Sequence, residues 1–325
     1  MVTCYSCFRP AESSKITCSK CSNVIHEDCA IDDRGTLFCD TCYTNQVAEP
    51  PKTEHAIPEV IRRSYIETYR TCPFKFLKQV IEENEQPPNC YTQIGIDLHD
   101  LFEKGLNDRS YEDVHMQADF DSIWQNVYPN MDLFESKTQQ EQMYDRAEKS
   151  IETFYQIIDD IPMPMVTEQT IHYEVGEGFP TVEFTMDAII ELEDGELEIL
   201  DWKTGRVTTG QKLSTDLQAP LYIYGVQKHF ERPVKRFTLY FLGENKVRTY
   251  ERVAHNKYVC TVGRREYHID LEDMVKEVRR VFSGIMKGNY NIPQDTKGMY
   301  FACKMCHIKK AGLCEGAELQ SWYNK

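Results

Sequence analysis

Apolar residues recur every three to four positions in some stretches of the chain and every second position in others. Helical spacing predicts helices over 59–82 and 94–106, and again near 215–229 and 267–287. A largely helical insertion is predicted over about 111–160, where two apolar stripes repeat at helical spacing. These stripes consist of Phe120, Ile123, Trp124, Val127, Ile151, Phe154, Tyr155 and Ile158. We expect them to form core, not a ligand site.

Strand-length apolar segments lie near 168–175, 181–192, 197–203 and 235–242. Together with the helices they predict an α/β core that carries a helical subdomain. The Asp194-Gly195 pair between the second and third strands is a strong hairpin signal.

Two aspartates and a lysine on this predicted hairpin suit metal-assisted cleavage of phosphodiesters. Asp187 lies on the first strand, and Asp201 and Lys203 lie on the second. Because side chains alternate along a strand, Asp201 and Lys203 share a face. Carboxylates hold Mg²⁺ or Mn²⁺, and a lysine stabilises the attacking hydroxide or the developing charge. A two-residue turn would place the aspartates on opposite faces, so the pattern requires an odd loop, such as Asp194–Glu196, or a bulge near Asp187.

Further polar residues lie on the predicted helices. Gln218 and Tyr222 are one turn apart on the helix after the hairpin. His99 lies on the helix that begins near Gly95. Taken singly, a surface glutamine, a core tyrosine and a structural histidine are the simpler interpretations.

In combination, these residues resemble the RecB-like branch of the PD-(D/E)XK nuclease superfamily. That family orders a Gly-x-x-x-His helix, a strand with Asp, a strand with Asp/Glu-x-Lys and a helix with Gln-x-x-x-Tyr. The matching positions are Gly95, His99, Asp187, Asp201, Lys203, Gln218 and Tyr222, within roughly residues 60–315. The resemblance implies a restriction-endonuclease-like core and a Mg²⁺ or Mn²⁺ site formed by Asp187, Asp201, the Trp202 carbonyl and His99. The family often has glycine shortly before the first aspartate, whereas this chain has Phe184-Thr-Met.

Four cysteines frame the predicted nuclease domain. Cys303, Cys306 and Cys314 cluster near the C-terminus, and Cys72 lies far upstream. The set resembles the iron–sulfur cysteines of AddB, of CRISPR spacer-acquisition nucleases and of eukaryotic exonuclease V, which implies a 4Fe–4S cluster. A four-cysteine zinc site is the alternative, because thiolates suit both metals.

The first 45 residues carry four further ligand pairs with metal-site spacing. The ligands are Cys4, Cys7, Cys18, Cys21, His26, Cys29, Cys39 and Cys42. Eight such ligands suit two tetrahedral zinc ions, which stabilise a segment too small to have its own core. The order resembles PHD and RING fingers, in which ligand pairs alternate between the two ions; sequential pairing is the alternative. Residues 46–58 form the predicted linker, and 59–325 the nuclease domain.

The formal charge of −15 argues against a broad surface that follows DNA phosphates. A narrow channel for single strands fits better. The segment from Gly205 to Lys212 superficially suggests a phosphate loop, but it lacks Gly-Lys-Ser/Thr because Gln211 intervenes. No apolar run suggests membrane insertion, and we expect a cytoplasmic protein, or a nuclear one in a eukaryote.

We therefore expect a metal-dependent DNA nuclease, an exonuclease or end-processing enzyme that prefers single strands. Recombination, repair or the processing of phage or foreign DNA would be its setting, with a helicase or recombination protein as a possible partner. The alternative is a non-catalytic scaffold that binds DNA or protein through the nuclease fold and zinc finger. Retention of Asp187, Asp201 and Lys203 in workable spacing argues against the scaffold.

Overall fold

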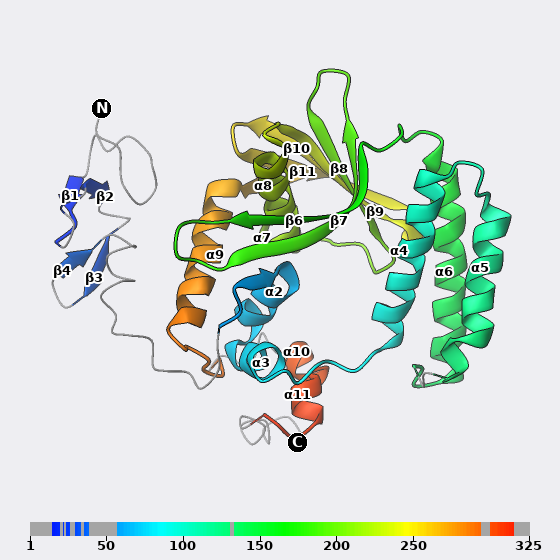
Figure 1. The fold of residues 1–325 in the computed structure, drawn as a ribbon, viewed down its shortest axis with the longest axis horizontal. Coiled ribbons are helices and arrows are strands. Elements are labelled where there is room, and N and C mark those ends of the chain that lie inside the picture. The colour runs from blue at the N-terminus through cyan, green and yellow to red at the C-terminus, as the bar shows by residue number, and fades with distance from the viewer. Residues whose placement is uncertain are drawn as a thin grey trace.

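A mixed eight-stranded sheet forms the centre of the computed structural model (Figure 1). The structure describes residues 15–19, 22, 24–26, 30–33, 36–38, 57–130, 133–293 and 300–314. The strands of the sheet are β5 (Val60–Arg62), β6 (Val166–Glu174), β7 (Thr181–Glu191), β8 (Leu197–Lys203), β9 (Val234–Phe241), β10 (Lys246–Ala254), β11 (Lys257–Val262) and β12 (Arg265–Asp270). Their order is β12-β11-β10-β9-β8-β7-β5, and β6 also pairs with β7. The β8–β9 and β5–β7 pairs are parallel, and the others are antiparallel.

Helices cover both faces of the sheet, which confirms the predicted α/β class. The helical elements are α2 (Arg63–Thr71), α3 (Pro73–Phe76), the π-helix η2 (Leu77–Ile81), α4 (Cys90–Asn107), α5 (Asp113–Asn126), η3 (Tyr128–Asn130), α6 (Lys137–Ile158), α7 (Lys212–Thr215), α8 (Gln218–Phe230), η4 (Leu242–Glu244), α9 (Leu271–Met286), α10 (Tyr300–Lys304) and α11 (His307–Lys310). One core lies between the sheet and α2, α8 and α9. A second core joins the sheet to α4, α5 and α6, which stand together at one end of the molecule (Figure 1).

Strand β8 divides its side chains between these two cores. Leu197 and Ile199 pack in the first core, whereas Leu200 and Trp202 pack in the second. Because side chains alternate along a strand, Asp201 lies on the face of the first core. The sheet therefore places this carboxylate on the side covered by α2 and α8.

The β7–β8 hairpin has the odd loop that converging aspartates require. Glu191 pairs with Leu197, and the Leu192 N–H donates to the Glu196 carbonyl at 2.9 Å. The loop therefore consists of the three residues 193–195, one position earlier than the Asp194–Glu196 example. Gly195 lies at its end with a φ of +80°, a conformation that favours glycine. This loop sets the register that brings Asp187 opposite Asp201.

Two element boundaries predicted from the sequence are wrong. The segment predicted as helix over 59–82 begins instead with strand β5, which pairs with β7. The helix predicted over 267–287 begins only at Leu271, because residues up to Asp270 belong to β12. Asp270 caps that helix by accepting from the Glu272 N–H at 2.9 Å. Strands β10, β11 and β12 extend the sheet beyond the four strands predicted.

The C-terminal helices lie beside the first helices of the domain. Figure 1 shows α10 and α11 next to α3. His307 of α11 contacts the Asn84 carbonyl with its Nε2 at 3.2 Å. The two ends of the domain are thus held side by side, more than 200 residues apart in sequence.

The described N-terminal residues form two small antiparallel sheets. Strand β1 (Lys15–Thr17) pairs with β2 (Val24–His26), and β3 (Ile31–Asp33) pairs with β4 (Thr36–Phe38). Within the described part of the chain, every helix is too short or too polar to cross a membrane.

Candidate active site

The β7–β8 ladder opens beside the two predicted aspartates. The last paired residues are Ala188 and Leu200. Beyond this pair, the N–H of Trp202, two positions after Leu200, donates to Asp187 Oδ2 at 2.5 Å, and Asp187 is buried. The carboxylate thus accepts a hydrogen bond from the neighbouring strand's backbone, and this bond fixes its orientation. The Trp202 ring packs edge-on against Phe154 in the second core. Ligation by its carbonyl stays a prediction.

Asp201 is only 2% exposed and has an unusual set of contacts. Its Oδ1 accepts from the Gln218 side-chain amide at 2.7 Å. Its Oδ2 forms an ion pair with Lys203 Nζ at 2.5 Å. Burial raises the pKa of Asp201 above the usual aspartate range, and the Lys203 charge opposes part of this shift. A buried carboxylate is costly unless a cation balances its charge, and both Lys203 and a bound metal ion could do so.

His99 reaches the same site from α4. Its Nδ1 lies 3.2 Å from Asp187 Oδ1. Burial lowers the pKa of His99, but the adjacent Asp187 carboxylate outweighs burial and the net pKa is raised. The glycine one turn earlier has ordinary space around it, because a Cβ on Gly95 would lie 3.6 Å from Thr204 Oγ1.

Tyr222 lies behind the carboxylates in the first core. Its ring stacks on Phe184 at a centroid distance of 4.2 Å. Burial and the Asp201 charge raise the pKa of its hydroxyl, which therefore stays protonated. Its contacts are those of a packing residue that supports Gln218 and Asp201, and its catalytic role stays a prediction.

Glu168 on β6 is a functional candidate that the sequence did not reveal. The ligand atoms of Glu168, His99 and Asp187 all lie within 4.8 Å of one another. The pairs on either side of it place Glu168 opposite Asp187, in a left-handed conformation with a φ of +45°. Burial and the Asp187 charge raise the pKa of Glu168 to about 7. No local motif marks this glutamate, because only the β6–β7 register brings it to the site.

The side chains of β7 change from one face of the sheet to the other near Asp187. Phe184 and Met186 pack in the first core, whereas Ala188 and Ile190 pack in the second, although all four have the same parity. Such a reversal needs a local distortion, and the left-handed Glu168 lies directly across from it. Left-handed non-glycine residues are costly and concentrate at functional sites. Here the left-handed residue, Glu168, is itself one of the three clustered ligand residues.

The donor set suits a hard divalent cation. Three carboxylates and one imidazole meet at the β6–β7–β8 junction, with Lys203 beside them. Oxygen-rich sites of this kind hold Mg²⁺ or Mn²⁺. The three residues whose ligand atoms lie within 4.8 Å of one another are His99, Asp187 and Glu168. The ligand set predicted from the sequence contained Asp201 and did not contain Glu168. Asp201 still lies close enough for the Asp187 charge to contribute to its raised pKa.

The four predicted cluster cysteines are described and free of disulfides. Burial raises the pKa of the Cys72 thiol, and Cys306 and Cys314 are close enough to raise it further. In the described part of the chain, no three thiols lie within 4.8 Å of one another. The metal that these cysteines would hold stays a prediction.

The predicted zinc ligands of the N-terminal segment fall largely outside the described residues. These are Cys4, Cys7, Cys21, Cys29, Cys39 and Cys42. Cys18 is buried and His26 ends β2. The two-zinc finger stays a prediction.

Comparison with known proteins gives one informative match. A family model described as "PD-(D/E)XK nuclease superfamily" matches residues 63–311. A solved structure titled "Crystal structure of SSO0001" aligns over 85% of this chain and 96% of its own, at 14% identity and a TM-score of 0.32. At these values the likeness carries no argument. No curated protein matches the chain.

Proposed function

Since the chain belongs to the PD-(D/E)XK nuclease superfamily, we propose that it is a metal-dependent nuclease that hydrolyses DNA, on single strands or at ends. The observation that carries this proposal is the meeting of Asp187, Asp201 and Glu168 with His99 and Lys203 at one junction of the sheet. A scaffold would gain nothing from this costly arrangement. A metal site offers a reason for it.

The residues divide the chemistry among themselves. Asp187, Asp201, His99 and Glu168 would hold Mg²⁺ or Mn²⁺, which polarises the scissile phosphate and lowers the pKa of a bound water. Lys203 projects its ammonium group beside Asp201, where it can orient the attacking water and stabilise negative charge.

Other contacts keep the carboxylates in place. Gln218 fixes one oxygen of Asp201, and the Trp202 N–H fixes one oxygen of Asp187. The second oxygen of each aspartate faces another residue of the site, Lys203 for Asp201 and His99 for Asp187. Such outer contacts orient metal ligands and tune their strength.

The preference for single strands or ends rests on charge. A chain with a formal charge of −15 offers little attraction to the whole length of a duplex. A short cationic path beside the site would suffice for one strand. The proposal includes exonuclease or end-processing activity in recombination, repair or the removal of foreign DNA, with a helicase or recombination partner to supply single strands.

We also propose a 4Fe–4S cluster on Cys72, Cys303, Cys306 and Cys314. It would join α10 and α11 to the N-terminal helices of the domain, where His307 already contacts the Asn84 carbonyl. The N-terminal segment would bind two zinc ions and recruit the enzyme to a partner or to a DNA end. Its tether would raise the local concentration of the nuclease there.

A direct assay tests the nuclease. Full-length protein, purified anaerobically, is incubated with end-labelled single- and double-stranded DNA, with and without added Mg²⁺ or Mn²⁺. We expect metal-dependent cleavage that is faster on single strands, and no cleavage by Asp201→Asn. Undiminished cleavage by that variant would sink the assignment, whereas DNA binding without cleavage under every condition would establish the scaffold.

A further inference from the structure

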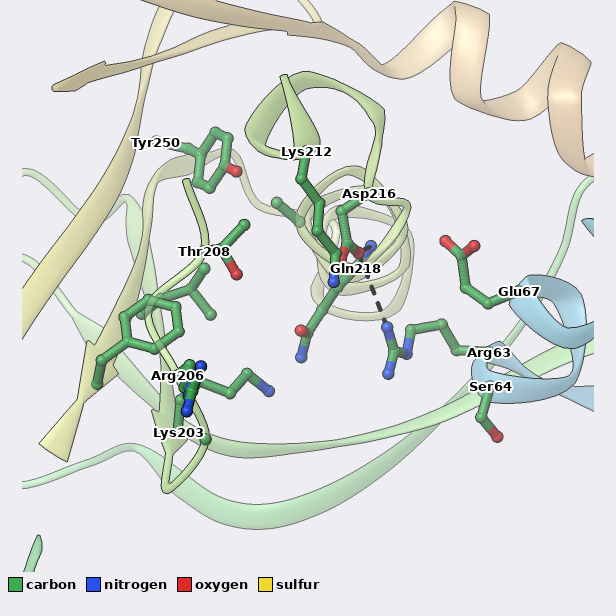
Figure 2. A pocket seen from close by; sticks show the side chains of 14 residues that line it. Arg63, Ser64, Glu67, Lys203, Arg206, Thr208, Lys212, Asp216, Gln218 and Tyr250 are labelled. Atoms are coloured by element: carbon green, nitrogen blue, oxygen red, sulfur yellow. Dashed lines mark hydrogen bonds and ion pairs between the residues drawn. The ribbon is translucent and has the colours of Figure 1, made fainter. Parts of the chain in front are cut away.

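A cavity of about 350 Å³ adjoins the candidate active site, between β8, α2 and the segment that follows β8. Lys203 and Gln218, which both contact Asp201, also line this cavity. Figure 2 shows Lys203, Lys212 and Arg63 pointing toward its centre around Gln218. The cavity therefore shares two residues with the candidate active site.

The lining is more cationic than the chain as a whole. Four of its side chains are cationic and two are carboxylates, in a protein of formal charge −15. Both carboxylates have other contacts. Glu67 binds Arg70 at 2.9 Å and accepts from the Leu217 N–H at 3.0 Å. Asp216 accepts from the Gln218 N–H at 2.8 Å and lies 3.9 Å from Arg63.

The other two cations of the lining are Arg206 and Lys212. Among the described residues, no carboxylate lies within 4.0 Å of either cation. A cationic hollow with low-dielectric walls concentrates anions. Leu239, Phe241 and Tyr250 provide such walls. The cavity therefore has the charge and surroundings that favour a phosphate group.

The segment that carries Arg206 is anchored on both sides. Arg146 Nε donates to the Thr204 carbonyl at 2.5 Å, and the Val207 N–H donates to Glu244 Oε1 at 3.2 Å. Held from α6 and η4, the loop presents Arg206 without a large ordering cost on binding.

The short helix α7, which carries Lys212, is held separately. The Tyr250 hydroxyl donates to the Leu213 carbonyl at 2.8 Å. Backbone on each side of the cavity is thus fixed before any ligand arrives. Only the long cationic side chains remain to adjust.

We propose that this cavity binds a phosphate group of the DNA strand next to the scissile one, through Arg206 and Lys212. The proposal rests on the nuclease function, because it assigns the cavity to the same substrate. A strand whose neighbouring phosphate is held here has its scissile phosphate placed beside Lys203. In this proposal the segment from Gly205 to Lys212 binds phosphate through the side chains of Arg206 and Lys212. A nucleotide-binding loop would instead bind phosphate through its backbone N–H groups.

Binding without cleavage tests the cavity independently of catalysis. Full-length protein, with no divalent ion added, is titrated with a fluorescent single-stranded 12-mer over a range of salt concentrations. Lys212→Gln and Arg206→Gln are each expected to weaken binding about tenfold. Each should also lower the slope of log affinity against log salt by about 0.7, the value for one lost contact on a single strand. Lys149→Gln, an exposed lysine on α6, is the matched control and should change neither.

Oligonucleotides with a 5′-phosphate, a 3′-phosphate or hydroxyls at both ends identify the source of the phosphate. KM for these oligonucleotides is measured in the cleavage assay with Mg²⁺ or Mn²⁺ added. If the cavity binds a terminal phosphate, one of the two phosphorylated oligonucleotides has a lower KM with wild-type protein, and Lys212→Gln abolishes that difference. If it takes an internal phosphate, Lys212→Gln raises KM equally for all three. Lys212→Arg should retain binding in either case.

Unchanged affinity and salt slope in both variants, with thermal unfolding like that of wild type, would overturn the cavity assignment while leaving the nuclease intact. A failure of the nuclease assignment would show itself separately, as cleavage by Asp201→Asn.

Discussion

The Gln218 side-chain amide donates to Asp201 Oδ1 at 2.7 Å and so joins the first turn of α8 to strand β8. Both residues are buried, so the bond is shielded from water. It fixes the carboxylate while the other oxygen pairs with Lys203. A residue that looks like an ordinary helix glutamine in the sequence therefore orients a candidate metal ligand.

Gln218→Ala should strongly lower the rate of DNA cleavage and should lower the free energy of unfolding only modestly. Loss of an outer contact to a metal ligand typically costs about 10–100-fold in metal affinity or activity. The lost hydrogen bond to a charged group should reduce the free energy of unfolding by about 1.5–3 kcal/mol. Cleavage rates over a Mn²⁺ titration and a urea denaturation curve measure the two effects. Gln156→Ala, exposed on α6, is the control, and equal activity in both variants would contradict the role.

Asp201→Asn should stabilise the protein when no Mg²⁺ or Mn²⁺ is added. Burial raises the pKa of Asp201 in the folded state. The stability that its neutral form contributes is therefore lost as the pH rises from the unfolded pKa through the folded one. Asparagine keeps the shape without the charge. We expect the Tm of the variant to gain on that of wild type as the pH rises above the usual aspartate pKa, by about 2–4 °C per kcal/mol recovered.

Added Mn²⁺ should reverse the order of the two proteins in that experiment. A cation that binds only the folded state raises Tm by mass action, and the wild type retains the Asp201 carboxylate that would ligate it. The variant should gain little. Equal Mn²⁺-dependent shifts in both proteins would remove Asp201 from the metal site.

Glu168→Gln tests the ligand that only the structure revealed. The substitution keeps size and the left-handed backbone but removes the charge near His99 and Asp187. Mn²⁺ affinity, measured by calorimetry, should fall at least tenfold. Glu174→Gln, at the exposed end of the same strand, should leave it unchanged. Identical affinities in the two variants would show that Glu168 lies near the metal without binding it.

Strand periodicity predicted that Asp201 and Lys203 share a face, whereas only the family resemblance assigned His99, Gln218 and Tyr222 to the candidate site. Asp201 and Lys203 are two positions apart on a strand, and Gln218 and Tyr222 are one helical turn apart. Glu168 could not be predicted, because its place depends on the β6–β7 register and on a left-handed residue within a strand. Strand β10 gave little signal, since Tyr250 is its only buried side chain among the described residues. The cationic cavity requires α2 to meet the segment after β8, which no local pattern encodes.

Removing residues 1–57 should leave cleavage of a short single-stranded oligonucleotide nearly unchanged. The candidate catalytic residues run from His99 to Tyr222, and the matched nuclease family begins at Arg63. Binding to a partner protein or a structured DNA end should weaken, because the tethered second contact is gone. If the shortened chain is folded and binds its iron but cannot cut the oligonucleotide, the N-terminal segment contributes to the active site itself.

Cys72→Ser should remove iron and loosen the contact between the two ends of the domain. Wild-type protein prepared anaerobically should be brown and carry about four irons, with about two zincs in the N-terminal segment. The variant should lose the visible absorbance and retain the zinc. Because α10 and α11 are short, their position beside α3 would then depend mainly on contacts such as that of His307 with the Asn84 carbonyl, and proteolysis there should accelerate. Cys90→Ala, a buried thiol in the second core, controls for the loss of a cysteine and should keep its iron. Colourless wild-type protein with about three zincs and no iron would establish the zinc alternative, in which the same four cysteines hold a single ion.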